Sequence, residues 1–451
     1  MSLKLRHYQE EGAAFLANHD AGFLFDEPGL GKTPQAIRAC DLVEARDVLV
    51  LCPASLLLNW DREFRKFQQR DRPVTVVKSA AQLPLKIRGV VVVSYGLAPK
   101  LNGILDDVSF DVLIPDECHY LKSGGAGRTL GVYGPKCDSV GGLAEMADQV
   151  FDLSGTPAPN HSAELWPALR ALAPETIDPH LEYRQFLDRY TTWHNGEYGI
   201  RVTGCRNTKE LRQRIAPVVL RRRKEDVLKE LPSITYAEVP VLAPRLPKEF
   251  REIEREVRPY VEAGLRAGNF SALGEAANDS VARLRRWVGL IKMGPVARLV
   301  ADELDDNKRK VVVFAQHRDV LTWLAERLRR FGVAMVHGGV PVEKRQAAVD
   351  AFQTDPQTRV FIGQIQAAGV GLTLTASSDV IFAESSWVPS DNQQAAQRVH
   401  RFGQTEACLA RFAVLAGSID EIVMATVARK SADISELLDG EREKALAFRP
   451  E

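Results

Sequence analysis

Short apolar runs recur in two groups along this chain, and they constrain its fold more than any other feature. Each run is rich in Val, Ile, Leu and Phe, and stretches with helical spacing separate several of them. Such runs between helices are typical of parallel strands that are buried on both faces. We therefore predict an α/β protein with two lobes, each a doubly wound parallel sheet. The runs are residues 23–25, 48–51, 90–93, 112–114 and 150–153 in the first group, and 311–314, 333–336, 360–362, 380–383 and 409–414 in the second.

The stretch between the two groups has a different pattern and is predicted to be mostly helical over residues 161–300. Residues 249–265 and 278–304 have helical periodicity and many charges, while prolines at 232 and from 240 to 247 interrupt the pattern and suggest a linker. The polar tail from residue 431 to 451 is predicted to form a surface helix. The predicted divisions are lobe one at 1–160, its helical extension and linker at 161–235, a helical protrusion at 236–300 and lobe two at 301–451.

The composition indicates an ordinary globular protein. Of 451 residues, 45% are hydrophobic and 26% are charged, with a formal net charge of zero. No apolar run reaches the roughly 18 residues of a membrane span, and no signal-peptide core follows the first residues, so we expect a cytoplasmic protein. The six cysteines form no Cys-x-x-Cys pair, which argues against a zinc site. Zero net charge gives no global sign of nucleic-acid binding, although a local basic groove stays compatible with it.

Residues 26–33, Asp-Glu-Pro-Gly-Leu-Gly-Lys-Thr, have the features of a phosphate-binding loop. The generic pattern has a glycine where Asp26 stands, but an apolar strand precedes the loop and Lys32 opens a helix. Backbone N–H groups at that helix start would hold phosphates, Lys32 would meet the β- and γ-phosphates, and the Thr33 hydroxyl would bind Mg²⁺. The alternative is a tight glycine-rich turn. We predict ATP and Mg²⁺ as cofactors, bound at Gly29, Leu30, Gly31, Lys32 and Thr33.

Two acids, Asp116 and Glu117, directly follow the apolar run at 112–114. Asp116 would hold Mg²⁺ and Glu117 would orient or deprotonate the attacking water, because phosphoryl transfer depends on positioning and charge neutralisation. An acid pair after a strand is by itself more often a helix cap. Together with Lys32 and Thr33 it predicts nucleotide hydrolysis.

Two arginines near the C-terminus, Arg398 and Arg401, would share a face if they lay on a helix. Cations aimed at a cleft would stabilise negative charge on the γ-phosphate, and arginine fingers of this kind contribute about 10³–10⁵ in rate. The alternative is a surface helix laced by salt bridges. The predicted catalytic residues are Lys32, Asp116, Glu117, Arg398 and Arg401.

With Ser154-Gly155-Thr156-Pro157 between them, these motifs occur in an order that resembles the Swi/Snf-related DNA translocases of helicase superfamily two. The segments 220–228, Leu-Arg-Arg-Arg-Lys-Glu-Asp-Val-Leu, and 400–404, His-Arg-Phe-Gly-Gln, are the most specific carriers of this resemblance. Residues 366–373 and 382–384 look most like the annealing-helicase (HARP-type) branch. The chain begins at the motor, so we expect that branch's accessory domains to be missing.

The resemblance implies two RecA-like lobes and adds several site residues. Gln9 would read the adenine edge, Gln35 joins the ATP-binding residues, and Gly155 and Thr156 would couple hydrolysis to lobe movement. Backbone N–H groups and hydroxyls would bind DNA phosphates without reading sequence. Trp387 matches a coupling tryptophan, and a buried core aromatic is the alternative there. The implied DNA-contacting residues are Ser55, Ser94, Tyr95, His337, Gly338, Gln364, Gly371, Thr373 and Trp387.

The sequence thus predicts a DNA-dependent ATPase that moves along double-stranded DNA, plain or branched. One alternative is a strand-separating or annealing helicase that acts at forks. Another is a nucleotide-switched DNA-binding protein without sustained turnover. A two-lobed motor can work alone, so we expect a monomer, which a partner protein could recruit. In a bacterium or phage it would act in the cytoplasm, at the nucleoid or in the host.

Overall fold

A computed structural model describes residues 4–105, 109–196, 199–243, 246–267, 275–306, 309–368, 372–441 and 449–450. The chain divides into two compact units, each of which is described by itself. The first comprises residues 1–191, 205–227 and 436–440, and the second comprises residues 192–204, 228–435 and 441–451. No helix in the described ranges is both long enough and apolar enough to cross a membrane.

The first unit is built on a seven-stranded sheet in the order β3-β4-β2-β5-β6-β1-β9, in which every pairing is parallel. Its central strands are buried on both faces, as the apolar runs predict. The strands are β1 (Ala21–Leu24), β2 (Val48–Cys52), β3 (Val74–Val77), β4 (Val90–Ser94), β5 (Phe110–Pro115), β6 (Ala147–Leu153) and β9 (Val219–Leu220).

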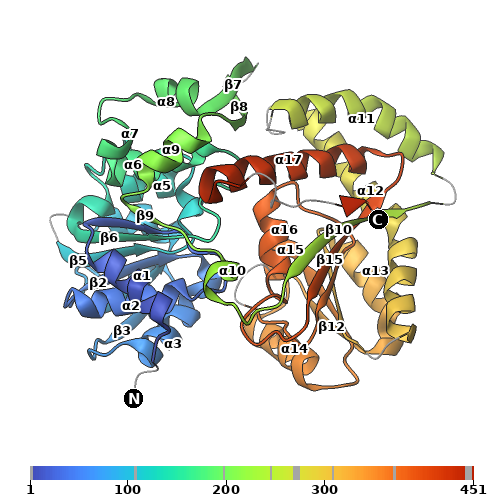
Figure 1. Ribbon diagram of the computed structural model, residues 1–451, viewed down its shortest axis with the longest axis horizontal. Coiled ribbons are helices and arrows are strands. Elements are labelled where there is room, and N and C mark those ends of the chain that lie inside the picture. Colours follow the sequence, from blue (N-terminus) through green and yellow to red (C-terminus); the bar gives the residue numbers. More distant parts are fainter. Residues whose placement is uncertain are drawn as a thin grey trace. The chain divides into compact units, whose positions relative to one another are not determined.

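Helices cover both faces of this sheet (Figure 1). One face packs against α1 (His7–Ala17), α2 (Lys32–Leu42) and α3 (Leu57–Phe67). The other packs against α4 (Ala98–Asn102), α5 (Gly127–Tyr133) and α6 (Trp166–Leu172). The further α-helices of this unit are α7 (Pro174–Ile177), α8 (Tyr183–Tyr190), α9 (Thr208–Ile215) and α10 (Lys224–Val227). Between α8 and α9, β7 (Thr191–Gly196) and β8 (Gly199–Cys205) form a hairpin whose residues 192–204 belong to the second unit.

The second unit repeats this strand order position by position, as β12-β13-β11-β14-β15-β10-β16, again with parallel pairings only. The prediction of two doubly wound parallel sheets is therefore confirmed. The strands are β10 (Ile234–Val241), β11 (Val311–Ala315), β12 (Val333–Val336), β13 (Val360–Gln364), β14 (Asp379–Phe382), β15 (Cys408–Leu415) and β16 (Arg449–Pro450).

Helices again lie on both faces of the second sheet (Figure 1). Residues of α14 (Val342–Thr354), α16 (Pro389–Ala396) and α17 (Ile419–Asp439) pack on one face, and residues of α12 (Glu275–Asp306) and α13 (Arg318–Leu328) pack on the other. A further apolar cluster joins α11 (Lys248–Ala267), α12 and α17. The short helix α15 (Ile365–Ala368) follows β13.

The prediction that residues 161–300 are mostly helical is confirmed, although this stretch also contains strands. The β7–β8 hairpin, β9 and β10 all lie in this stretch. β10 runs through Pro240, where a linker was predicted, and pairs with β15 over its whole length. Its sequence, Ile-Thr-Tyr-Ala-Glu-Val-Pro-Val, mixes polar and apolar residues because only some of its side chains are buried. The tail is helical as far as Asp439, within α17, and residues 442–448 and 451 lie outside the described ranges.

Candidate nucleotide-hydrolysis site

The phosphate loop connects β1 to α2 in the first unit. Gly29 and Gly31 have φ angles of 97° and 74°, a left-handed backbone that glycine adopts without the steric cost of a Cβ atom. Gly31 is the N-cap of α2, so the unpaired N–H groups of the helix's first turn lie directly after it. The helix dipole adds partial positive charge at this end. The local backbone therefore has the form of an anion-binding site.

Lys32 is the first residue of α2, and its Nζ atom donates a 2.7 Å hydrogen bond to the carbonyl oxygen of Asp26. Burial of the ammonium group lowers the pKa of Lys32, and the carboxylate of Glu117 is the strongest charge acting in the opposite direction. Lys32 and the loop that carries Asp116 and Glu117, here called the acid loop, thus share one electrostatic environment. Thr33 is half-buried in the same turn of the helix.

Asp116 directly follows β5 and is 7% exposed. Trp60 Nε1, on α3, donates to its Oδ2 at 2.8 Å, and the backbone N–H of Glu117 donates to its Oδ1 at 3.0 Å. Burial, reinforced by repulsion from the Glu117 carboxylate, raises the pKa of Asp116 to about 7. A bound cation would favour the ionised form of such a buried acid pair, so the donors present fit a divalent metal ion.

Glu117 has a φ of 55°, a left-handed conformation that is uncommon outside glycine. Its Oε2 lies 3.3 Å from Nδ1 of His119, and the same ring nitrogen lies 3.1 Å from Oγ of Ser154. Ser154 follows β6, which lies between β5 and β1 in the sheet. The glutamate is therefore connected through His119 to the motif that follows the neighbouring strand.

Gly155 connects this motif to the phosphate loop. A Cβ atom at Gly155 would lie 2.5 Å from Cγ of Pro28, closer than side chains pack. Beside it, the backbone N–H of Thr156 donates to Ser154 Oγ at 3.1 Å. Residues 154–156 thus contact both the acid loop and the phosphate loop, which is the arrangement that the predicted coupling role requires.

Three other predicted site residues of this unit bond to the loops themselves. Gln9 Nε2 donates to the carbonyl of Leu30 at 3.2 Å. Gln35 is fully buried, and its amide donates to Asp26 Oδ2 at 3.1 Å and to the Gly31 carbonyl at 3.1 Å. Tyr95 is 3% exposed and donates from its hydroxyl to the Asp116 carbonyl at 2.8 Å. Its side chain supports the acid loop, so we remove Tyr95 from the proposed DNA contacts.

In the second unit, predicted DNA-contacting residues also lie at the carboxyl ends of parallel strands. Gln364 ends β13, and His337 and Gly338 follow β12, its neighbour in the sheet. The backbone N–H of Gly338 donates to Gln364 Oε1 at 3.0 Å, which joins the two strand ends. Gly371 lies outside the described residues. In the first unit, Ser55 and Ser94 likewise lie after β2 and at the end of β4.

Arg398 and Arg401 belong to the second unit and do not lie on a helix, because α16 ends at Ala396. Arg398 is 9% exposed. Arg401 Nη1 donates to the Leu372 carbonyl at 2.9 Å and to Thr373 Oγ1 at 3.2 Å, and burial lowers the pKa of its guanidinium. The helix-face argument for the pair is thus wrong, and the turns after α16 position both side chains instead.

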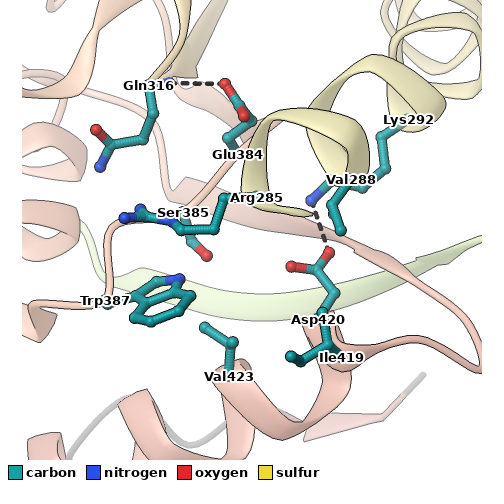
Figure 2. A pocket seen from close by; sticks show the side chains of 10 residues that line it. All are labelled: Arg285, Val288, Lys292, Gln316, Glu384, Ser385, Trp387, Ile419, Asp420 and Val423. Carbon is teal, nitrogen blue, oxygen red and sulfur yellow. Dashed lines mark hydrogen bonds and ion pairs between the residues drawn. The ribbon is translucent and has the colours of Figure 1, made fainter. Parts of the chain in front are cut away.

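Trp387 is half-buried and lines a small cavity of about 30 Å³ in the second unit (Figure 2). The Arg285 guanidinium carbon lies 4.4 Å from the centre of its ring, a cation–π contact. In the same cavity Lys292 on α12 pairs with Asp420 on α17 at 2.7 Å. The cavity has room for about one water molecule. Packing therefore explains Trp387 at least as well as a DNA contact does.

No group of three or more His, Cys, Asp or Glu side chains in the described ranges could hold a metal ion. A metal ion at Thr33 and Asp116 would thus need further oxygen ligands from phosphate and water, as Mg²⁺ sites on nucleotides commonly do. None of the six cysteines, all of which lie in the described ranges, forms a disulfide bond.

Sequence reasoning missed the residues that hold the two loops in place. Trp60 gave no local signal, because it occupies an apolar position of an amphipathic helix. In isolation, the basic block Arg-Arg-Arg-Lys at 221–224 is typical of a solvated helix face. Instead, Arg221 and Arg222 turn inward, where Arg221 donates to the carbonyls of Phe25 and Gly155 at 2.7 and 3.1 Å. Only the resemblance of residues 220–228 to the translocases pointed to a role.

Two family models match the chain. The SNF2-related domain matches residues 8–241 and the helicase conserved C-terminal domain matches residues 292–403. Together they include the phosphate loop, the acid loop and the two C-terminal arginines.

Two curated relatives and one solved structure are among the proteins similar to this chain. The chain is 32% identical over 460 residues to "DNA annealing helicase and endonuclease ZRANB3" of Mus musculus, covering 98% of this chain and 42% of the relative. It is 30% identical over 438 residues to "SWI/SNF-related matrix-associated actin-dependent regulator of chromatin subfamily A-like protein 1 homolog" of Caenorhabditis elegans, covering 95% and 61%. The "Sulfolobus solfataricus SWI2/SNF2 ATPase core in complex with dsDNA" has 22% identity and a TM-score of 0.45, and covers 100% of this chain and 98% of that one.

The chain thus spans less than two thirds of these two curated relatives. The resemblance to the Swi/Snf group and its annealing-helicase branch is confirmed at the level of family. The SNF2-related match alone covers more than half of the chain, and the helicase match follows it in the expected order. The chain therefore belongs to the SNF2-related family of helicase-like, DNA-dependent ATPases.

Proposed function

We propose that this protein is an ATP-dependent translocase on double-stranded DNA. The observation that carries the proposal is that three motifs lie together at the carboxyl ends of β1, β6 and β5. They are the phosphate loop, residues 154–156 and the acid loop. Glu117 is the strongest opposing charge on Lys32, and residues 154–156 contact both loops. Carboxyl ends of parallel strands are where α/β sheets bind their ligands. The arrangement supports hydrolysis of a nucleoside triphosphate.

In the proposed site the phosphate loop and the first turn of α2 bind the phosphates. Lys32 neutralises the β- and γ-phosphates, and Gln9 lies beside Leu30, where it would meet the base. Thr33 and Asp116 would hold Mg²⁺, which when bound supplies charge neutralisation at the phosphates. Glu117 orients the attacking water, with His119 holding its carboxylate. Arg398 and Arg401 complete the site from the second unit in this proposal.

DNA would be held by phosphate contacts from both units. Ser55 and Ser94 in the first unit, and His337 in the second, offer hydroxyl and ring donors near strand ends, and Thr373 adds an exposed hydroxyl in the stretch before β14. Donors of this kind position a duplex without reading its sequence. Alternating grip by the two units, driven by ATP binding and hydrolysis, would then move the protein along the duplex.

The test is ATP hydrolysis at one fixed salt concentration without nucleic acid and with single-stranded, duplex or branched DNA. Plain duplex should stimulate hydrolysis strongly, and added salt should weaken the stimulation because phosphate contacts release counterions. A triplex-displacement assay on duplex DNA then measures movement. ATP hydrolysis that no DNA stimulates would contradict the proposal.

A second function, strand separation or annealing at forks, is favoured by the β7–β8 hairpin. Arg429 Nη1 on α17 donates to the carbonyl of Thr203 in β8 at 3.2 Å, which anchors this hairpin in the second unit. A hairpin could split strands, and the mouse relative's name includes annealing helicase activity. Replacing residues 193–203 by a short Gly-Ser linker should abolish unwinding of a forked duplex under this alternative. It should leave triplex displacement intact if translocation is the function.

A further inference from the structure

Asp26 stands where phosphate loops usually have a glycine, and its side chain is fully buried. Arg222 grips this carboxylate with two hydrogen bonds, from Nε to Oδ1 at 3.0 Å and from Nη2 to Oδ2 at 2.6 Å. Two-pronged arginine–carboxylate pairs fix direction as well as distance. A buried ion pair also leaves a costly unpaired charge when one partner is removed. The start of the phosphate loop is therefore held in place by an arginine that is distant in sequence.

The same guanidinium group also donates hydrogen bonds to residues of α1 and α2. Its Nη2 donates to Gln35 Oε1 at 2.7 Å, and its Nη1 donates to the carbonyl of Tyr8 on α1. Gln35 in turn donates to Asp26 and to the carbonyls of Leu30 and Gly31. One arginine thus ties together the start of the loop, its end and the helix that carries Gln9.

Space for this cluster depends on α1. A Cβ atom on Gly12 would lie 1.8 Å from Gln35 Oε1 and 2.7 Å from Arg222 Nη2. Gly12 is in the middle of a helix, where alanine would be favoured by about 1 kcal/mol. Its presence is explained by the room that the amide and guanidinium groups need.

The segment that carries Arg222 runs beside the loop. β9 pairs with β1, and the pairing continues beyond both strands: Phe25 N–H donates to the Leu220 carbonyl at 2.8 Å, and Glu27 N–H to the Arg222 carbonyl at 3.0 Å. Lys224 N–H then donates to Glu27 Oε2 at 2.7 Å. After Val227 the chain passes into the second unit. The first half of the phosphate loop is therefore hydrogen-bonded to the stretch of chain that leads out of its own unit.

We propose that Arg222 is a positioning residue for the ATP-binding loop, and that residues 219–224 link the state of that loop to the connection between the units. This inference rests on the proposed function, because it concerns regulation of the same site. Displacement of the connecting chain would pull on Asp26 and Glu27 and so change phosphate affinity. Conversely, a bound nucleotide would hold the segment in place.

The test compares Arg222→Gln and Asp26→Asn, singly and together, by the KM for ATP, kcat and the Kd of a fluorescent ADP analogue. Each single variant should raise KM and Kd by about tenfold, with kcat at saturating ATP within about threefold. The double variant should be no worse than the single ones, because the two groups act as one unit. Arg222→Lys keeps the positive charge but loses the two-pronged hydrogen bonding of the guanidinium group. Its KM and Kd should lie between those of the wild type and Arg222→Gln.

Two further variants separate positioning from folding. Arg214→Gln is the matched control, since Arg214 lies outside residues 219–224 and pairs with Glu210 one helical turn away, and its KM and Kd should not change. Gly12→Ala disturbs the cluster without removing a charge, and should also raise KM. An unchanged KM with a smaller folded fraction in Arg222→Gln and Gly12→Ala would overturn the inference. ADP affinity does not depend on DNA, so it tests this inference even if DNA fails to stimulate ATP hydrolysis by any of the proteins. Such a failure would contradict the translocase proposal alone.

Discussion

After β5 in the first unit stand Asp116 and Glu117, and after β14, which holds the same place in the second sheet, stand Ala383 and Glu384. Glu384 accepts hydrogen bonds from the backbone N–H groups of Gln316 and His317 at 2.9 Å and contacts the His317 ring at 2.7 Å. It thus stabilises the start of α13. An acid at one topological position supports a helix in one sheet and faces a phosphate loop in the other.

The loops after the first strands differ in the same way. β1 leads into the glycine-rich loop and Lys32, whereas the β10 strand is followed by the connection to α11. The same strand order therefore serves two purposes, and the difference lies in the loops at the carboxyl ends. This agrees with the general rule that function belongs to sites placed on a fold rather than to the fold itself.

The largest expected effect concerns the one segment of the second unit to which we assign chemistry. Arg398→Gln or Arg401→Gln should each lower DNA-stimulated kcat by about 10³-fold, because each would remove a cation from the γ-phosphate in the transition state. ADP affinity should stay within about threefold. Arg411→Gln is the control, since Arg411 pairs with Glu303 and Asp379 inside the second unit. If kcat decreased by less than threefold in both the Arg398→Gln and the Arg401→Gln variant, all of the chemistry would be assigned to the first unit.

The two acids provide the next test of the contrast. Glu117→Gln should lower kcat by about 10²-fold while ATP binding persists, because it removes the group that orients water. Glu384→Gln should leave kcat unchanged and lower the free energy of unfolding by about 1–2 kcal/mol. Single-turnover hydrolysis and urea unfolding measure the two effects. Equally slow hydrolysis by the wild type and Glu117→Gln, so that the substitution changes little, would instead favour the nucleotide-switch alternative.

Gly155 tests the contact between the two loops of the first unit. Gly155→Ala places a methyl group against Pro28 and should lower kcat/KM by about tenfold through displacement of the phosphate loop. Gly125→Ala is the matched control, because a Cβ atom there meets nothing within 4 Å. Equal kcat/KM values for the two variants would show that the loops do not depend on this contact.

The smallest expected effect concerns buried carboxylates. In the second unit Asp420 has Lys292 as its partner, whereas Asp152 in the first accepts a 2.7 Å hydrogen bond from the Tyr133 hydroxyl. Burial raises the pKa of Asp152 to about 7, above the roughly 4 of an unfolded chain. The folded state therefore holds a proton that the unfolded state has lost, and stability falls as pH rises from about 4 to 7.

Asp152→Asn removes this titration because the amide stays neutral. Relative to that variant, the wild-type free energy of unfolding should fall by about 1 kcal/mol between pH 6 and pH 7 and level off above pH 8. Urea unfolding at each pH measures it. Parallel curves for the two proteins would mean that Asp152 is already ionised at pH 6.

Much of the fold and of the nucleotide site could be predicted from local patterns. Runs such as Val48–Leu51 and Val90–Val93 predict buried parallel strands because a strand covered on both faces needs apolar side chains throughout. Gly29, Gly31 and Lys32 predict an anion loop because left-handed backbone and a cation at a helix start are local properties. The same holds for Asp116 and Glu117, since an acid at a strand end needs no partner to be recognised.

What the tertiary structure alone decided depends on partners that are distant in sequence. β9 has two residues and β10 contains Glu238 and Pro240, so their place in the sheets follows from the strands beside them. The inward direction of Arg222 follows from the buried Asp26. An isolated basic block is solvated by default, because burying a charge is unfavourable unless a partner is already in place. Local sequence therefore determined which chemistry this protein carries, and long-range packing determined which residues hold that chemistry in position.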